Sequence, residues 1–234
     1  MCGSTREGEE SALLDAFEEL GREGTRLSLV LAPRHLRRVP AVEELARRRG
    51  LAVRRRSECR LPGDPVARGE RNPVARDERN PVARGERNPP VLVLDTMGEL
   101  LSFYAASDVA FVGGSLAPLG GHNPLEPAAA GVPVLFGPSM ENFREPALGL
   151  LAAGAAESTD GAHALALAVG RLLADPGERQ RRGEAARRVA RAGAGASERC
   201  AIELVRAGLV RDLRPETPES PARPAPERAG ALRP

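Results

Sequence analysis

A glycine-rich stretch, GGSLAPLGGHNPLE at 113–126, constrains the fold of this chain more than any other segment. The apolar run 109–112 before it predicts a buried strand. Asn123 and Pro124 predict a helix start, with Asn123 as the cap and Glu126 at the capping-box position. Four glycines allow positive φ angles and a close approach to a ligand: Gly113, Gly114, Gly120 and Gly121. This order predicts an anion site, because unpaired N–H groups and the positive end of the helix dipole face outward together.

The same stretch could also be a structural turn, since glycine turns and capping boxes occur in many α/β domains that bind nothing there. The density of polar side chains distinguishes the two interpretations. A merely structural turn does not need the four that lie here: Ser115, His122, Asn123 and Glu126. We therefore expect a ligand site at this loop.

The composition excludes several functional classes. A net charge of +2, without a basic stripe interleaved with aromatic residues, argues against nucleic acid as a partner. Cys2, Cys59 and Cys200 are isolated and odd in number, so neither a metal site nor a disulfide framework is expected. No apolar run approaches the roughly 20 residues of a membrane span. The chain as given is expected to be soluble.

Apolar strands alternate with amphipathic helices along the chain. Residues 1–9 are expected to form a polar loop, with Met1 and Cys2 as the only remnant of a preceding strand. Helix 10–20 has an inner face of Leu13, Leu14, Phe17 and Leu20. The other expected elements are strands 27–31, 51–55, 91–94, 109–112 and 133–136, helices 40–49, 97–106, 124–130, 142–153 and 162–174, and a helical region from 177. This alternation predicts an α/β fold with a mostly parallel, doubly wound sheet.

Two further strand ends carry polar residues. Arg34 and His35 follow strand 27–31, and the Arg fork matches two oxygens of a phosphate or carboxylate. An exposed loop arginine is the alternative. Thr96 and Glu99 follow strand 91–94 with capping-box spacing. Because ligands bind at the carboxyl ends of strands in open α/β sheets, both ends would face the cleft predicted at 113–126.

Helix 97–106 is expected to turn Leu100, Leu101 and Tyr104 inward. His163, on helix 162–174, is expected to be a surface residue rather than a ligand.

Two segments are expected to be disordered. Residues 64–88 repeat an octapeptide, DPVARGER, NPVARDER and NPVARGER, with nearly balanced charge and little apolar surface. Residues 211–234 are rich in proline without apolar periodicity. We therefore expect one domain over 1–210, with a disordered insertion at 64–89 and a disordered tail at 211–234.

Five motifs together resemble one family. They are GSTREGEE at 3–10, APRH at 32–35, DTMGEL at 95–100, FVGGS at 111–115 and GGHNPLEPAA at 120–129. In this order they are similar to the C-terminal half of the 3-deoxy-D-manno-octulosonic acid (Kdo) transferases, although the family usually has His in place of Arg6. The resemblance runs from about Gly3 to about Val205. It implies the Rossmann-like C-terminal domain of a GT-B glycosyltransferase.

The family transfers Kdo from CMP-Kdo to a lipid A precursor in lipopolysaccharide biosynthesis, at the inner membrane. Matched by motif, the resemblance implies that Arg34 and His35 face the CMP phosphate. Met97, Gly98 and Glu99 would line the nucleotide pocket. The glycine-rich stretch 113–126, the glycine loop, holds the rest of the implied donor site. These residues are Gly114, Ser115 and His122, with Asn123 and Glu126 on the ribose and phosphate side. No cofactor or metal is expected, because Arg and helix dipoles can stabilise the leaving CMP.

The family's membrane anchor, acceptor site and carboxylate general base belong to its N-terminal domain. No catalytic residue is therefore expected in this chain, which would need a complementing N-terminal half for transfer. Glu7, Glu9 and Glu10 are expected to cap and start a helix instead. The alternatives are a non-catalytic CMP- or CMP-Kdo-binding module, a degenerate gene remnant, and another GT-B nucleotide-sugar transferase. The expected location is the cytoplasm or the cytoplasmic face of the inner membrane.

Overall fold

A computed structural model describes residues 1–59, 91–193 and 203–207 of the chain. Residues Met1–Gly193 form one compact unit, and Ala194–Pro234 form a second unit of which only a short helical piece is described. The octapeptide repeats, Cys200 and the proline-rich tail lie outside the described residues. No helix within the described ranges is long and apolar enough to cross a membrane.

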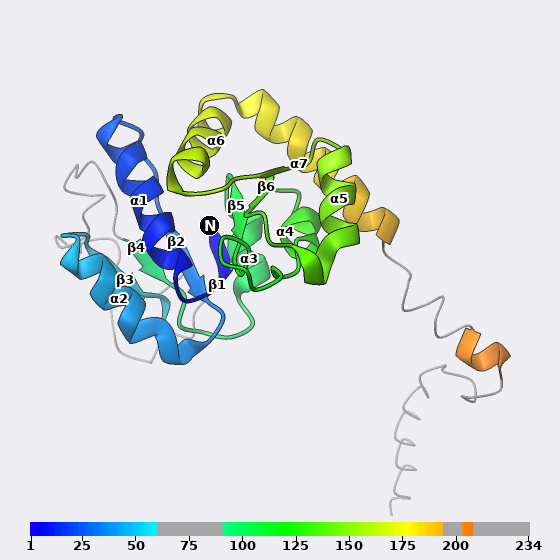
Figure 1. The fold of residues 1–234 in the computed structure, drawn as a ribbon, viewed down its shortest axis with the longest axis horizontal. Coiled ribbons are helices and arrows are strands. Elements are labelled where there is room, and N and C mark those ends of the chain that lie inside the picture. Colours follow the sequence, from blue (N-terminus) through cyan, green and yellow to red (C-terminus); the bar gives the residue numbers. More distant parts are fainter. Residues whose placement is uncertain (60–90, 194–202, 208–234) are drawn as a thin grey trace, which may run out of the picture. The chain divides into compact units, whose positions relative to one another are not determined.

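Seven parallel strands form one sheet at the centre of the first unit (Figure 1). The strands are β1 Cys2–Thr5, β2 Val30–Pro33, β3 Val53–Arg55, β4 Val91–Val93, β5 Ala110–Val112, β6 Val134–Phe136 and β7 Ala156–Ser158. Their order across the sheet is β3-β4-β2-β1-β5-β6-β7, and every neighbouring pair is parallel. The predicted doubly wound parallel sheet is confirmed.

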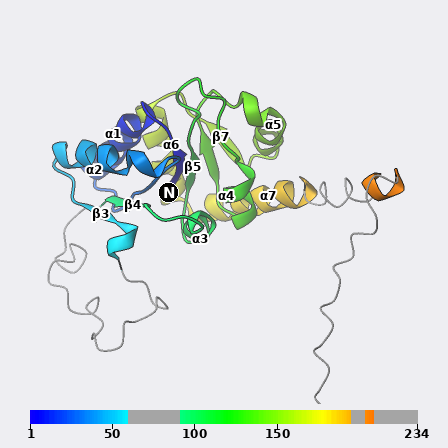
Figure 2. The same ribbon diagram turned by 90° about the horizontal axis from the view of Figure 1, so that it is seen from below.

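Helices cover both faces of this sheet. They are α1 Glu9–Arg22, α2 Val39–Arg48, α3 Leu100–Ala105, α4 Leu125–Ala130, α5 Arg144–Ala152, α6 Ala162–Ala174 and α7 Pro176–Gly193, with 3₁₀ turns at Leu36–Arg38, Arg56–Glu58 and Glu141–Phe143. Figure 2 shows α1, α2 and α6 above the sheet and α3, α4 and α7 below it. The alternation along β5 fits these two layers, because Phe111 packs with the α1, α2 and α6 side chains while Ala110 and Val112 face the other layer.

The N-terminal residues depart most from the sequence prediction. The segment expected as a polar loop contains β1, which lies in the middle of the sheet between β2 and β5. Cys2 is in register with Leu31 on one side and Phe111 on the other. The expectation was wrong because the sequence CGST has neither alternation nor large apolar residues, and pairing with two neighbours holds it extended. Its irregularity is local, with a register shift after Gly3 and a φ of 56° at Ser4.

Several other boundaries are also corrected. The strand expected at 27–31 is Val30–Pro33, because pairing with β4 begins at Val30 and pairing with β1 begins at Leu31 and continues to Pro33. The helix expected at 97–106 starts at Leu100, since Gly98 has a φ of +84° that a right-handed helix does not allow. Leu101 on that helix is 55% exposed, so it does not belong to the predicted inner face. Strand β7 was not predicted.

Helix α1 confirms its predicted inner face. Leu13, Leu14, Phe17 and Leu20 are all buried in the larger core cluster of the domain. The contact between α1 and α6 fixes one layer over β1 and β2. The amino end of α1 is thereby held directly after the central strand, where it bears on the site.

Candidate functional site

The order in which the chain adds strands to the sheet reverses at β1. From β1 the chain moves outward through β2 to the β3 edge, and after β4 it crosses to β5, β6 and β7 on the other side. In open α/β sheets ligands bind at the carboxyl ends of the strands beside such a switch point. The segments after Thr5 of β1 and after Val112 of β5 therefore border the candidate site.

The glycine loop approaches β1 very closely at Gly113. The Gly113 N–H donates to the Gly3 carbonyl at 2.8 Å, and a Cβ on Gly113 would lie 2.5 Å from the carbonyl oxygen of Ser4. Positive φ angles occur at Gly114, Gly120 and Gly121, as predicted. Gly113 differs from the prediction, because its φ is not positive and the backbone that it approaches is the protein's own.

The loop amides, which the sequence suggested were free for a ligand, are occupied. The Glu9 carboxylate is fully buried and accepts N–H bonds from Gly114 at 2.7 Å and from Ser115 and Leu116 at 2.8 Å each. It also accepts the N–H of Arg6 at 2.9 Å. Glu9 does begin α1, as predicted, but its side chain reaches across to the glycine loop. The expectation of outward-facing amides at 114–116 was wrong.

The side chain of Ser115 is also hydrogen-bonded within the protein. It is fully buried, and its hydroxyl donates to the Val112 carbonyl at 2.5 Å and accepts the Gly137 N–H at 2.7 Å. These bonds tie the end of β5 to the turn after β6. Ser115 thus shapes the loop, and its polar atoms face the interior.

The distal part of the loop is closed by contacts that the sequence did not suggest. Gly121 N–H donates to the Gly114 carbonyl at 2.8 Å, and Gly120 N–H donates to the Ser139 hydroxyl at 2.9 Å. Asn142 donates its side-chain amide to the Leu119 carbonyl at 3.2 Å. The only signal for these residues is the polar turn PSMEN at 138–142, directly after the strand that became β6.

The loop ends in the predicted helix start. The Asn123 side-chain oxygen accepts the Leu125 N–H at 3.1 Å, but α4 begins at Leu125 with Pro124 in the cap position, so the predicted cap by Asn123 is wrong by one residue. Within the described residues, no hydrogen bond joins Glu126 to the Asn123 N–H, so the second half of the capping box is not formed. Glu126 is exposed on the first turn of α4, and its charge helps burial to raise the pKa of Tyr104 on α3.

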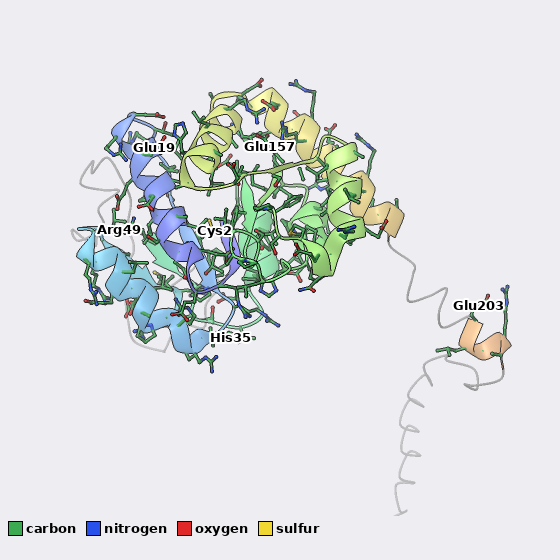
Figure 3. The ribbon with its side chains drawn as sticks, in the orientation of Figure 1. Cys2, Glu19, His35, Arg49, Glu157 and Glu203 are labelled. Atoms are coloured by element: carbon green, nitrogen blue, oxygen red, sulfur yellow. The ribbon has the colours of Figure 1, made fainter. Side chains whose placement is uncertain are left out.

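Basic side chains gather around the switch point. Arg6 follows β1, and its Nη1 atom lies 3.3 Å from His35 Nε2. Arg34 and His35 follow β2 and are exposed. The pKa of His35 is lowered by desolvation and by the charges of Arg6, Arg37 and Arg34. Figure 3 shows His35 at the edge of the domain, at the opposite end of α1 from Glu19.

His122 adds a fourth basic group from the glycine loop. It is half-buried, and a Cβ on Gly114 would lie 3.0 Å from its Cδ2 atom, so the ring rests against Gly114. Burial lowers the pKa of His122, the charges of Arg34 and Arg6 lower it further, and the charge of Glu9 opposes them. The two arginines therefore act on both histidines. We name Arg6, Arg34, His35 and His122 the basic cluster.

The loop after β4 lies one strand beyond β2. Met97 is 76% exposed there, and Gly98 has the positive φ that turns the chain into α3. Glu99 accepts from Arg56 Nε at 3.0 Å and Nη2 at 2.8 Å, and it also bonds to the Thr96 hydroxyl. The predicted cap of α3 by Thr96 is wrong, because its hydroxyl binds the Glu99 carboxylate instead of a backbone N–H.

His163 is confirmed as a surface residue. Its Nδ1 atom lies 2.6 Å from Glu19 Oε1, at the end of α1 away from the basic cluster. Among the residues that the structure describes, no group of three or more His, Cys, Asp and Glu side chains is placed to hold a metal ion.

Comparison with curated proteins identifies relatives, whereas no protein-family model matches the chain. A 3-deoxy-D-manno-octulosonic acid transferase of Bordetella pertussis is 40% identical over 200 residues, which cover 84% of this chain and 41% of that protein. A transferase of the same name from Haemophilus influenzae is 34% identical over 214 residues, covering 91% of this chain and 44% of the relative. The matched part is the C-terminal half of these proteins. This chain is related to the C-terminal half of the Kdo transferase family. It spans less than half the length of these two relatives.

A solved structure agrees with the family and with the fold. It is the crystal structure of the C-terminal CMP-Kdo binding domain of WaaA from Acinetobacter baumannii. The TM-score is 0.64 at 29% sequence identity, and the match covers 80% of this chain and 86% of that domain. The fold is thus that of the C-terminal domain of a GT-B glycosyltransferase.

Proposed function

We propose that this chain is the donor-binding half of a Kdo transferase and that it binds CMP-Kdo at the switch point of its sheet. The basic cluster is the observation that carries the proposal. It brings together two arginines and two histidines from three loops at the carboxyl ends of the central strands, which is where ligands bind in open α/β sheets. The name of the structurally similar Acinetobacter domain, a CMP-Kdo binding domain, supports the same ligand.

The chemistry of the donor fits this cluster. CMP-Kdo carries two anionic groups, the phosphate and the sugar carboxylate, and guanidinium forks bind both kinds of group through paired oxygens. Arg34 and His35 are proposed to face the phosphate. His122 is proposed to bind the donor from the glycine loop. Charged side chains and helix dipoles can stabilise the departing CMP without a metal or other cofactor.

The remaining proposed site residues have different tasks. Met97, Gly98 and Glu99 would line the nucleotide pocket, and Asn123 with Glu126 would hold the ribose and phosphate side. Since the amides of Gly114 and Ser115 already bind Glu9, these two residues would contribute the shape of the loop.

The full reaction is proposed to be transfer of Kdo to a lipid A precursor during lipopolysaccharide biosynthesis. The acceptor site and the general base would come from an N-terminal domain, in the same or a complementing chain, at the cytoplasmic face of the inner membrane. The carboxylates after β1 support this division. Glu7 and Glu10 pair with Arg38, and Glu9 binds backbone amides, so each already has a structural partner. The proposed donor domain ends near residue 210, before the proline-rich tail.

Calorimetric titration with CMP tests the proposal. The wild-type chain should bind CMP saturably, and Arg34→Ala should weaken binding about 10- to 150-fold, the equivalent of one charge-assisted hydrogen bond of roughly 1.5–3 kcal/mol. Arg188→Ala is the matched control, because Arg188 is an exposed arginine on α7. Its affinity should equal that of the wild type.

Thermal unfolding in the same samples separates the alternatives. Absence of CMP binding by a cooperatively unfolding wild type would refute donor binding. Absence of both binding and cooperative unfolding would indicate a degenerate remnant. Tighter binding of UMP than of CMP would favour another GT-B nucleotide-sugar transferase.

A further inference from the structure

Two consecutive carboxylates at the start of α1 are buried, and they have different hydrogen-bond partners. Glu9 is 0% exposed and Glu10 is 1% exposed. The Glu10 carboxylate lies 3.2 Å and 3.4 Å from two nitrogens of Arg38, and it accepts the Thr5 hydroxyl at 3.5 Å. Its contacts thus join α1 to the segments around β1 and β2. The bonds to Glu9 come from backbone N–H groups instead.

The Glu9 contacts cross the switch point itself. Glu9 follows β1 in the chain, and three of its four donors belong to the loop after β5. One oxygen accepts the Ser115 and Leu116 N–H groups, and the other accepts those of Gly114 and Arg6. A buried ionised group is tolerated when it is fully hydrogen-bonded. The loop amides therefore form an anion recess whose occupant is the protein's own carboxylate.

This recess is in direct contact with the basic cluster. Gly114 donates to Glu9 on one side, and the His122 ring rests against it on the other. Arg6, whose N–H also binds Glu9, places its guanidinium beside His35. The Glu9 carboxylate thus holds the backbone of Gly114, against which His122 packs, and the backbone of Arg6, whose guanidinium lies beside His35.

We propose that Glu9 is a positioning residue of the donor site: by filling the amide recess of the glycine loop, it fixes Gly114 and Arg6 and thereby the placement of His122 and the basic cluster. The inference rests on the proposed function, because it assigns Glu9 a role in binding the donor. A phosphate or carboxylate of the ligand binds to the cluster side chains rather than to the amides of 114–116. Displacing a fully buried carboxylate would cost more than binding beside it.

A pair of isosteric substitutions tests this role. Glu9→Gln keeps the side-chain size but turns an NH₂ group toward backbone donors, so two N–H groups lose their acceptor. Glu10→Gln makes the same chemical change one residue away, at a carboxylate whose side-chain hydrogen bonds, among the described residues, go to Arg38 and Thr5. Both variants should unfold at lower temperature than the wild type. CMP affinity should fall about tenfold or more in Glu9→Gln, the effect of roughly 1.4 kcal/mol, and stay within about twofold in Glu10→Gln.

The ionisation of His122 gives a second readout, followed by NMR as a function of pH. The groups acting on His122 are Arg34, Arg6 and His35, which lower its pKa, and Glu9, which raises it. Glu9→Gln should therefore lower the pKa of His122 further. Glu10→Gln should leave it unchanged, which separates positioning from a general loss of stability.

The outcomes distinguish this inference from the proposed function. If the wild type binds no CMP, the proposed function fails and takes the positioning role with it. If the wild type binds CMP and a folded Glu9→Gln variant binds it equally well, the positioning role alone is overturned. Should Glu9→Gln fail to fold, Glu9→Asp keeps the charge but withdraws it by one methylene group. Wild-type affinity in a folded Glu9→Asp variant, or failure of both variants to fold, would refute positioning as the role of Glu9.

Discussion

Replacing Gly113 by alanine should damage both the sheet and the site, because the added methyl group meets only backbone. A Cβ at this position lies 2.5 Å from the Ser4 oxygen and 2.7 Å from the Thr5 Cα atom. Carbon atoms pack at about 3.5–4.0 Å, so β1 and β5 must separate by roughly 1 Å at their carboxyl ends. That movement stretches the bond of 2.8 Å between Gly113 N–H and the Gly3 carbonyl.

The cost can be worked out from these contacts. Overpacking costs about 1–3 kcal/mol, and a weakened hydrogen bond adds about 0.5–1.5 kcal/mol. A total of about 3 kcal/mol corresponds to a Tm roughly 6–12 °C lower for a chain of this size. Thermal unfolding followed by circular dichroism measures this shift. CMP affinity should fall as well, because the same movement displaces the loop that carries His122.

Gly149→Ala is the matched control. Gly149 is exposed in α5, and its nearest contact would be an ordinary one, 3.7 Å from Val189 Cγ1. Alanine in a helix interior is favoured over glycine by about 0.5–1 kcal/mol, so this variant should be slightly more stable than the wild type. If Gly113→Ala were as stable as Gly149→Ala, the close approach of β5 to β1 would be refuted.

Two further predictions concern the layer that carries α1. Leu14→Ala should lower the free energy of unfolding by about 3 kcal/mol in urea denaturation, because Leu14 is fully buried in the larger core cluster. Arg38→Ala should lower the free energy of unfolding by about 2–3 kcal/mol at pH 8, because it leaves the buried Glu10 carboxylate without its cationic partner. The loss is moderate because the Arg38 side chain is 21% exposed in the wild type. Burial raises the pKa of Glu10 and Arg38 opposes that rise. In Arg38→Ala the folded-state pKa is therefore higher still, so the deficit should shrink as the pH falls through it, and a pH-independent deficit would contradict this account.

Sequence patterns predicted elements wherever apolar spacing and helix signals agreed. The period of Leu13, Leu14, Phe17 and Leu20 predicted the buried face of α1, and the glycines of 113–126 predicted a left-handed backbone at three of four positions. Patterns failed at β1, because four small and polar residues carry no strand signal of their own. They failed again at Leu101, whose helix is too short for its periodicity to define a face.

The sequence by itself determined the family, the parallel α/β class and the loops that border the site. Five short motifs carried the family resemblance, and local residue types predicted the glycine turns and the apolar face of α1. Only the tertiary structure decided how these loops use their polar groups. Glu9 lies 105 residues from Gly114 in the chain, and a bond at that separation leaves no local pattern. Whether an amide recess is free for a ligand depends on which distant side chain the fold brings to it, and here the sheet order brings Glu9.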